Sequence, residues 1–201
     1  MMAWDMLELP YLANLAAAGV RAEDVDFVMC THLHTDHVGW NTKLVDGVWQ
    51  PTFQKARYLI GRTEFEYWEK ETTAGDPRIF ADSVKPVWDA GLVDLVATDH
   101  RICDEVSLVP TLGHTPGHVS VRISSHGEEA LITGDFIHHP CQMAHTEWGS
   151  AFDFDPPASV RTRERMFADL AGKPVLVIGT HFAAPTAGHI VRDGDAFRLA
   201  V

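Results

Sequence analysis

An H-x-H-x-D-H motif directly behind an apolar run constrains this chain more than any other feature. The run Val25 to Cys30 leads into His32, His34, Asp36 and His37, so three imidazoles and one carboxylate fall within six residues. Packing of a hydrophobic core does not explain four metal-binding side chains at this spacing. The motif therefore predicts a metal site that follows a buried strand.

Alternation along an extended strand end determines which of these side chains face the same way. Residues two apart point to the same side, so His32 and His34 can bind one ion. A turn at Thr35 is expected to direct Asp36 and His37 toward a second position nearby. Neutral imidazole and carboxylate suit Zn²⁺ best, although Mn, Fe or Co also accept such donors.

Further metal-binding residue types follow three later apolar runs. His114 and His118 lie in T-L-G-H-T-P-G-H behind Val106 to Val109, Asp135 lies in T-G-D behind Ala130 to Ile132, and His181 lies in G-T-H behind Val175 to Ile178. Strand ends that deliver ligands to one face assemble a metal cluster on a rigid sheet. The later residues are therefore expected to complete the site.

With this order of ligands, the chain resembles the metallo-β-lactamase-fold metallohydrolase superfamily. In motif it is most similar to the acyl-homoserine-lactone lactonase and organophosphate hydrolase-like branch. The resemblance implies an α/β fold, the αββα sandwich. It also implies seven ligands to two Zn²⁺ ions: His32, His34 and His114 on the first, Asp36, His37 and His181 on the second, and Asp135 bridging both.

The resemblance also implies chemistry, namely a dinuclear hydrolase whose metal-bridging hydroxide opens a lactone or a related ester. Asp36 would keep the second metal open toward the substrate. Lactonases of the superfamily tend to carry a tyrosine three residues after the bridging aspartate, where this chain has His138. His138 is therefore either a general acid or a loop histidine that binds water, while His118 is expected to have a structural role.

Several other functions on the same scaffold stay open. A β-lactamase, a glyoxalase II-like thioesterase and a mononuclear iron dioxygenase are alternatives, as is a truncated remnant that binds metal without turnover. A true zinc β-lactamase generally lacks the bridging aspartate. The colour and metal content of the protein would separate a one-iron oxidoreductase from a two-zinc hydrolase.

Composition limits the remaining classes. With 201 residues and 46% hydrophobic content, residues 1–201 are expected to form a single domain with a proper core. The formal charge of −12 disfavours nucleic acid as a partner and leaves a small-molecule substrate. Cys30, Cys103 and Cys141 show no paired spacing and are expected to be small buried residues in a reducing compartment.

A cytoplasmic location is expected on two grounds. No apolar run approaches the roughly 20 residues needed to span a bilayer. Asp5 and Glu8 also do not fit a basic leader with an apolar core. Only about thirty residues precede the motif, so the N-terminal strands of the first sheet are expected to be missing or shortened. The exposed sheet edge would then favour a homo-oligomer.

Local patterns predict the remaining elements. Asp46-Gly47 is typical of a tight hairpin, and Thr63 to Glu66 forms a capping box that opens a helix toward Lys70. Trp40, Phe65, Trp68 and Trp88 are candidates for a substrate-pocket wall, with the core as the alternative place for them. Helices are predicted over 10–18, 63–70, 78–90 with a break at Pro86, and 155–170. Strands are predicted over 25–31, 57–60, 93–97, 106–109, 119–123, 130–133, 175–178, 190–192 and 196–199, with those from 93 to 133 in the second sheet.

Overall fold

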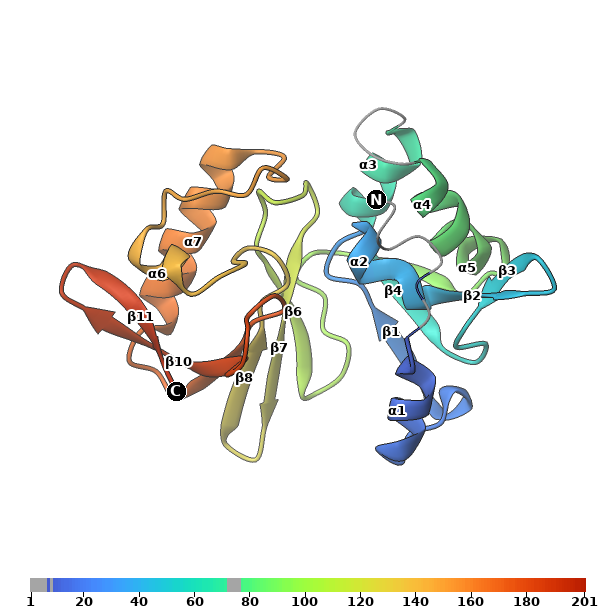
Figure 1. The fold of residues 1–201 in the computed structure, drawn as a ribbon, viewed down its shortest axis with the longest axis horizontal. Helices are drawn as coiled ribbons and strands as arrows, with labels where there is room; N and C mark the ends of the chain where they lie inside the picture. The colour runs from blue at the N-terminus through green and yellow to red at the C-terminus, as the bar shows by residue number, and fades with distance from the viewer. Residues whose placement is uncertain (1–6, 8, 72–76) are drawn as a thin grey trace. The chain divides into compact units, whose positions relative to one another are not determined.

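In the computed structural model of this protein, residues 7, 9–71 and 77–201 are described (Figure 1). Two compact units make up the chain: Met1–Ile60 with Phe65–Leu95, and Gly61–Glu64 with Val96–Val201. Both units mix helices and strands, so the predicted α/β class is confirmed. The single domain over residues 1–201 stays a prediction. Asp5 and Glu8, used above to argue against a leader, lie outside the described residues.

Short helices and strands follow one another along the chain from Tyr11 to Val96, most of which belongs to the first unit. In chain order they are α1 (Tyr11–Ala17), the 3-10 turn η2 (Ala22–Asp24), β1 (Phe27–Met29), α2 (Thr35–Val38), the 3-10 turn η3 (Gly39–Asn41), β2 (Thr42–Val45), β3 (Val48–Pro51), β4 (Arg57–Gly61), α3 (Arg62–Lys70), α4 (Pro77–Ser83), α5 (Lys85–Asp89) and β5 (Val93–Val96). The hairpin β2–β3 turns at Asp46 and Gly47, both with positive φ, as predicted.

The three-stranded sheet of the first unit has the order β1-β4-β5. Strands β1 and β4 run parallel, with Val28 opposite Tyr58. The prediction that residues 93–97 belong to the second sheet was therefore wrong. After α5 the chain turns at Gly91, with φ +70°, and the backbone N–H of Tyr58 donates to the carbonyl of Leu92. A local hydrophobic pattern cannot show which sheet a strand joins.

Two apolar clusters form the core of the first unit. One consists of Cys30, Leu33, Val38, Ile60, Phe65 and Val84. The other consists of Phe53, Ala56, Tyr58 and Val87. Leu33, which is 2% exposed, lies between His32 and His34 and anchors that segment in the core.

The second unit is built on a six-stranded sheet of order β11-β10-β9-β8-β7-β6. Its elements are β6 (Val106–Pro110), β7 (Val119–Ser125), β8 (Glu128–Ile132), α6 (Cys141–Ala144), α7 (Pro156–Leu170), β9 (Val175–Ile178), β10 (Ala187–Asp193) and β11 (Ala196–Ala200). Neighbouring strands are antiparallel except β8 and β9, which run parallel. A parallel pair needs a long crossover, which here contains α6 and α7.

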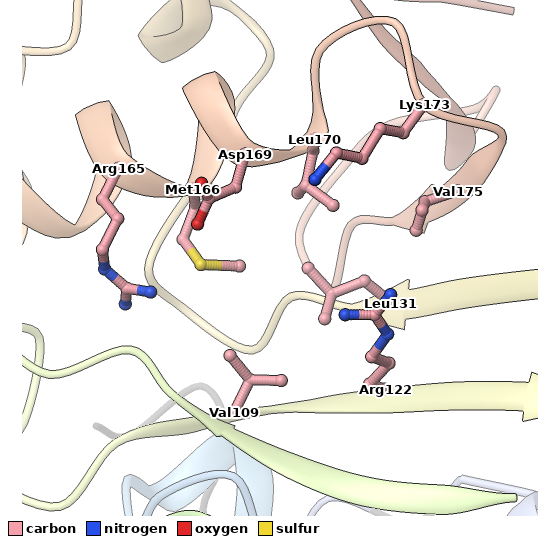
Figure 2. Close-up of a pocket in the computed structure, with 9 residues that line it drawn as sticks. All are labelled: Val109, Arg122, Leu131, Arg165, Met166, Asp169, Leu170, Lys173 and Val175. Atoms are coloured by element: carbon pink, nitrogen blue, oxygen red, sulfur yellow. The ribbon is translucent and has the colours of Figure 1, made fainter.

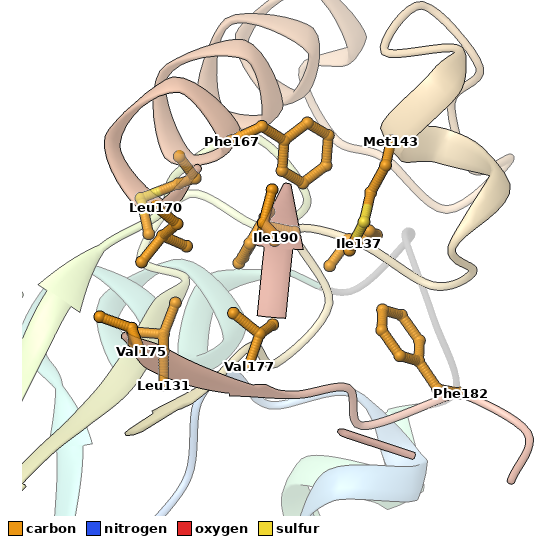
Figure 3. Packing of buried hydrophobic residues seen from close by; sticks show 11 residues of the cluster. Leu131, Ile137, Met143, Phe167, Leu170, Val175, Val177, Phe182 and Ile190 are labelled. Carbon is orange, nitrogen blue, oxygen red and sulfur yellow. The ribbon is translucent and has the colours of Figure 1, made fainter. Parts of the chain in front are cut away.

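Helix α7 begins where the sequence predicts and covers the core of the second unit (Figure 3). Its N-cap is Asp155, whose carboxylate accepts from the backbone N–H of Ala158 at 2.9 Å. Phe167 on α7 is fully buried with Val177 of β9 and Ile190 of β10. This packing fixes α7 on the sheet, so a side chain on its buried face has a defined place.

The predicted capping box at Thr63 to Glu66 was wrong. Helix α3 starts at Arg62, so Thr63 lies inside it. The neighbouring Glu64 has a tertiary contact: its carboxylate accepts from the backbone N–H of Gly117, at 2.9 Å. A Cβ on Gly117 would lie 2.5 Å from the Glu64 backbone nitrogen, so this close approach requires glycine.

Two smaller expectations also differ from the structure. The helical stretch from 78 onward breaks at Val84, between α4 and α5, and Pro86 lies in the first turn of α5. Proline fits there because the first N–H groups of a helix have no intrahelical acceptor. Cys30 is buried as expected, but Cys103 is exposed and Cys141 is half-buried.

A hollow beside α7 lies between that helix and strands β6 to β8 (Figure 2). Five apolar side chains and four charged ones line it: Val109, Leu131, Met166, Leu170, Val175, Arg122, Arg165, Asp169 and Lys173. Arg122 pairs with Glu129, and Arg165 donates to the carbonyl of Pro110 at 2.7 Å. The long basic side chains thus cover the edge of the core while their charges reach water.

No helix in the described ranges combines the length and the apolar character needed to cross a bilayer.

Candidate metal centre

In the first unit, His32 and His34 bring two ring nitrogens together. His32 Nε2 lies 3.0 Å from His34 Nδ1, and the other ring nitrogen of His32 lies 3.1 Å from Thr31 Oγ1. His32 is fully buried. The threonine therefore occupies one side of the His32 ring and leaves Nε2 directed at His34.

Asp36 and His37 lie on the one-turn helix α2, for which His34 is the N-cap residue. The turn expected at Thr35 is thus the start of a helix. The His37 ring lies 4.0 Å from the His32 ring between centroids, and His37 Nε2 lies 3.5 Å from Asp36 Oδ2. All four residues of the motif therefore cluster within the first unit.

The four aromatic candidates for a pocket wall have different surroundings. The Trp68 ring lies 5.4 Å from the His34 ring, edge to face. Phe65 belongs to the core, and Trp88 packs on it with centroids 4.6 Å apart. The Trp40 ring lies 5.0 Å from the Tyr11 ring between centroids, with the planes tilted by 33°. Trp68 is thus the one of these four that we find beside a ring of the motif.

In the second unit, three histidines converge on one carboxylate oxygen. Oδ2 of Asp135 lies 3.1 Å from His181 Nε2, 3.2 Å from His138 Nε2 and 3.5 Å from His114 Nε2. Ligand atoms of His114, Asp135 and His138 all lie within 4.8 Å of one another. This group joins His138, expected to be either a general acid or a loop histidine, to three of the predicted ligands.

Strand ends explain how residues so far apart in sequence meet. Asp135 follows β8 and His181 follows β9, and these strands run parallel. Their carboxyl ends therefore lie at the same edge of the sheet. The backbone N–H of Thr133 still donates to the carbonyl of Ile178 at 3.0 Å, so the two strands stay paired up to the cluster.

His118 holds the backbone of Asp135. Its Nε2 accepts from the Asp135 N–H at 2.8 Å, and its Nδ1 lies 2.9 Å from Thr111 Oγ1. Because Nε2 accepts, the ring proton is on Nδ1, where it can be donated to the threonine. The fully buried ring thus fixes the peptide that carries the carboxylate.

Asp153 was missed by sequence reasoning. Its Oδ1 accepts from His114 Nδ1 at 3.0 Å, and its Oδ2 accepts from the Ser150 N–H at 3.1 Å. Oδ2 also lies 3.7 Å from Nη1 of Arg163, whose side chain is fully buried. The only local signal is an aspartate two residues before the N-cap Asp155, which short-range patterns do not relate to a histidine some forty residues away.

Electrostatics keep Asp153 charged. Burial raises the pKa of its carboxyl, but hydrogen bonds from His114 and the Ser150 backbone, with the charge of Arg163, outweigh burial and hold the pKa below its usual value. Burial lowers the pKa of the Arg163 guanidinium, against the charge of Asp153. An arginine pKa starts so high that the group remains a cation.

The donors in both units fit a divalent metal. Imidazole nitrogens and carboxylate oxygens are the ligands that Zn²⁺ takes in proteins, and the second unit gathers three of the former around one of the latter. His114 also donates a hydrogen bond from its other ring N–H, at Nδ1, to the Asp153 carboxylate, an arrangement typical of metal-binding histidines.

Comparison with known proteins agrees with the resemblance that the motif suggested. The sequence profile of the Metallo-beta-lactamase superfamily matches residues 2–181. An N-acyl homoserine lactonase from a Bacillus species is 27% identical over 112 residues, which cover 55% of this chain and 38% of that relative. The alignment therefore spans less than half the length of the curated relative.

Solved structures share the fold. The hydrolase AbOPH of the beta lactamase superfamily is 26% identical, with a TM-score of 0.82 over 94% of this chain and 68% of its own. AidC, a dizinc quorum-quenching lactonase, is 21% identical, with a TM-score of 0.76 over 95% of this chain and 69% of its own. At that identity, the second likeness concerns the fold alone.

Proposed function

Because the chain belongs to the metallo-beta-lactamase superfamily, we propose that it is a dinuclear metal hydrolase that opens a lactone or a related ester. The main support is the convergence of three imidazole Nε2 atoms within 3.5 Å of Asp135 Oδ2. The pairing of His32 and His34 ring nitrogens at 3.0 Å adds a second group of donors. The lactone substrate class is suggested by the Bacillus lactonase.

The proposed ligands are those implied by the motif: His32, His34 and His114 for one Zn²⁺, Asp36, His37 and His181 for the other, and Asp135 for both. When bound, such ions lower the pKa of water, so that a strong nucleophile is available at neutral pH, and they polarise the substrate carbonyl. The protein's own part is to orient these donors. Asp36 is proposed to leave the second ion accessible to the substrate.

Asp135 has the central role in this proposal, because only a carboxylate offers two oxygens and a negative charge between two cations. Its position is held by His118 through the backbone. Asp135→Ala is expected to reduce bound zinc from two ions to one or none, measured by elemental analysis of the purified protein. A variant that keeps two ions and the full rate would refute the bridging assignment.

His138 is proposed to hold a proton at Nε2 and deliver it to the leaving alkoxide. It lies 3.2 Å from Asp135 Oδ2, within hydrogen-bond reach. The same proximity would also suit a metal ligand. His138→Ala separates the two roles: a changed pH–rate profile with both zincs retained supports proton transfer, whereas loss of zinc supports ligation. Unchanged rate and profile would contradict both.

A pH-stat experiment tests the reaction itself. Zinc-reconstituted protein is offered an acyl-homoserine lactone, an aryl ester, a thioester and a β-lactam, each of which releases acid on hydrolysis. The proposal expects the lactone to be the best substrate, with activity lost in His32→Ala. A preference for the thioester or the β-lactam would favour those alternatives, and a coloured one-iron protein would favour the dioxygenase.

A homo-oligomer is also proposed. Strand β1 lies at the end of the order β1-β4-β5, and its Phe27 is 50% exposed. An edge strand presents backbone groups that can pair with a second copy. Size-exclusion chromatography with light scattering is expected to give a mass above 22.3 kDa, whereas a stable monomer at high concentration would argue against pairing.

A further inference from the structure

Arg163 is the largest of the fully buried side chains in the described part of the protein. It lies on α7 in the stretch Arg161 to Arg165, whose other charged residues are exposed. Removing a guanidinium from water costs several kcal/mol unless partners compensate it. A hydrophobic side chain of similar size would fill this place without that desolvation cost. The groups that contact Arg163 therefore indicate why an arginine is buried here.

The polar partners of its Nε and Nη1 atoms belong to the segment that follows β8. Nε donates to the carbonyl of Thr146 at 2.8 Å, and Nη1 donates to the carbonyl of Phe136 at 3.5 Å. Nη1 also lies 3.7 Å from Asp153 Oδ2. One guanidinium thus contacts the residue directly after Asp135 and the carboxylate that holds His114.

These contacts relate Arg163 to two proposed metal ligands from different strand ends. Asp153 orients the His114 ring so that Nε2 faces Asp135, while the bond to Phe136 restrains the turn that carries Asp135. The planar guanidinium has donors in fixed directions, which suits contacts to several acceptors at once. A lysine at this place would offer a single point charge.

We infer that Arg163 is a positioning residue, which acts through Asp153 and the Phe136 carbonyl to orient His114 and Asp135 for metal binding. The inference rests on the proposed function for its metal but not for its substrate. Residues that orient a metal-binding histidine typically contribute 10- to 100-fold to metal affinity. Arg163 is assigned the same kind of effect, although it acts on His114 through Asp153.

Three variants test the assignment: Arg163→Met, Arg163→Lys and Asp153→Asn, with Arg161→Met as the exposed control on the same helix. Zinc affinity is measured by competition with a chromophoric chelator, starting from metal-free protein. We expect Arg163→Met and Asp153→Asn each to weaken zinc binding by about 10- to 100-fold. Arg161→Met should bind like the wild type. Arg163→Lys should recover less than half of the lost free energy of binding.

The double variant Arg163→Met/Asp153→Asn tests whether the two residues act on the same histidine. If they do, its affinity loss is close to the larger single loss rather than to the product of both. Nitrogen-15 spectra of the metal-free proteins report the His114 tautomer directly. The wild type is expected to carry the proton on Nδ1, and both single variants should populate the other tautomer.

The outcomes separate this inference from the proposed function. Zinc binding with no hydrolysis of any ester refutes the proposed function and leaves the assignment of Arg163 standing. Folded Arg163→Met with wild-type zinc affinity and an unchanged His114 tautomer overturns the assignment, whatever the activity. If Arg163→Met does not fold, Asp153→Asn and Arg163→Lys decide by the same two readouts.

Discussion

Removal of the Tyr58 hydroxyl tests the polar contacts in the core of the first unit. The Phe53 N–H donates to Tyr58 Oη at 3.0 Å, and Oη donates to the carbonyl of Asn41 at 2.9 Å. In Tyr58→Phe the Asn41 carbonyl keeps a bond from the Thr52 N–H at 3.0 Å, whereas the Phe53 N–H loses its acceptor. One buried donor left without a partner costs about 1–3 kcal/mol of unfolding free energy.

The tyrosine also makes this cost depend on pH. Burial raises the pKa of Tyr58 to about 12, against hydrogen bonds from the backbone that lower it. Above pH 10 the unfolded chain releases the phenolic proton while the folded protein keeps it, so this contribution to stability falls as pH rises. Between pH 7 and pH 11 the loss is about 1.4 kcal/mol, which Tyr58→Phe does not undergo.

Urea unfolding followed by tryptophan fluorescence at pH 7, 9, 10 and 11 measures both effects. At pH 7 the wild type is expected to be more stable than Tyr58→Phe by about 1–3 kcal/mol, and the gap should shrink by about 1.4 kcal/mol at pH 11. Tyr11→Phe, which alters a tyrosine with 40% exposure, is the matched control and should change neither quantity. A gap that stays constant with pH would refute the reasoning.

Three further substitutions probe packing and the glycine positions, each by thermal or urea unfolding. Phe167→Ala should cost about 3–5 kcal/mol, because the ring is fully buried between α7 and the sheet; a loss below 1 kcal/mol would contradict that packing. Gly113→Ala should destabilise by about 2 kcal/mol or more, since φ is +128° and the new Cβ would lie 2.3 Å from the Ser159 nitrogen; wild-type stability would exclude that approach. Glu64→Ala should cost about 1–3 kcal/mol by removing the acceptor of the Gly117 N–H, and an unchanged midpoint would show that water replaces it.

The sequence predicted features well where the residues that define them lie close together in the chain. The motif from His32 to His37 combines metal-binding residue types with a predicted turn at Thr35, where α2 starts, and Asp155 with two prolines is a strong helix signal. Asp135 and His181 were expected to lie together because each follows an apolar strand, and His181 Nε2 lies 3.1 Å from Asp135 Oδ2. Such signals depend on residues within a few positions of each other, so they survive without knowledge of the tertiary fold.

Long-range roles could not be predicted in the same way. Arg163 sits in a highly charged helical stretch that is typical of a solvated face, and only the packing of α7 buries it. The helix signal at Thr63 and Glu66 gives no role to Glu64, yet the Glu64 carboxylate accepts from the backbone N–H of Gly117, fifty-three positions later. Strand β5 matched a strand pattern, but its sheet is decided by the turn at Gly91. In each case a distant partner outweighs the local preference.

The four residues Gly61–Glu64 belong to the second unit although the residues on both sides of them belong to the first. A fragment that starts at Val96 would lack the Glu64 carboxylate, and the backbone N–H of Gly117 would lose its acceptor in the loop that leads from His114 to His118. Exchange of the second unit between relatives by a single crossover near residue 95 would separate this pair in the same way. An exchange of the second unit between relatives therefore has to include Gly61–Glu64 as well as Val96–Val201.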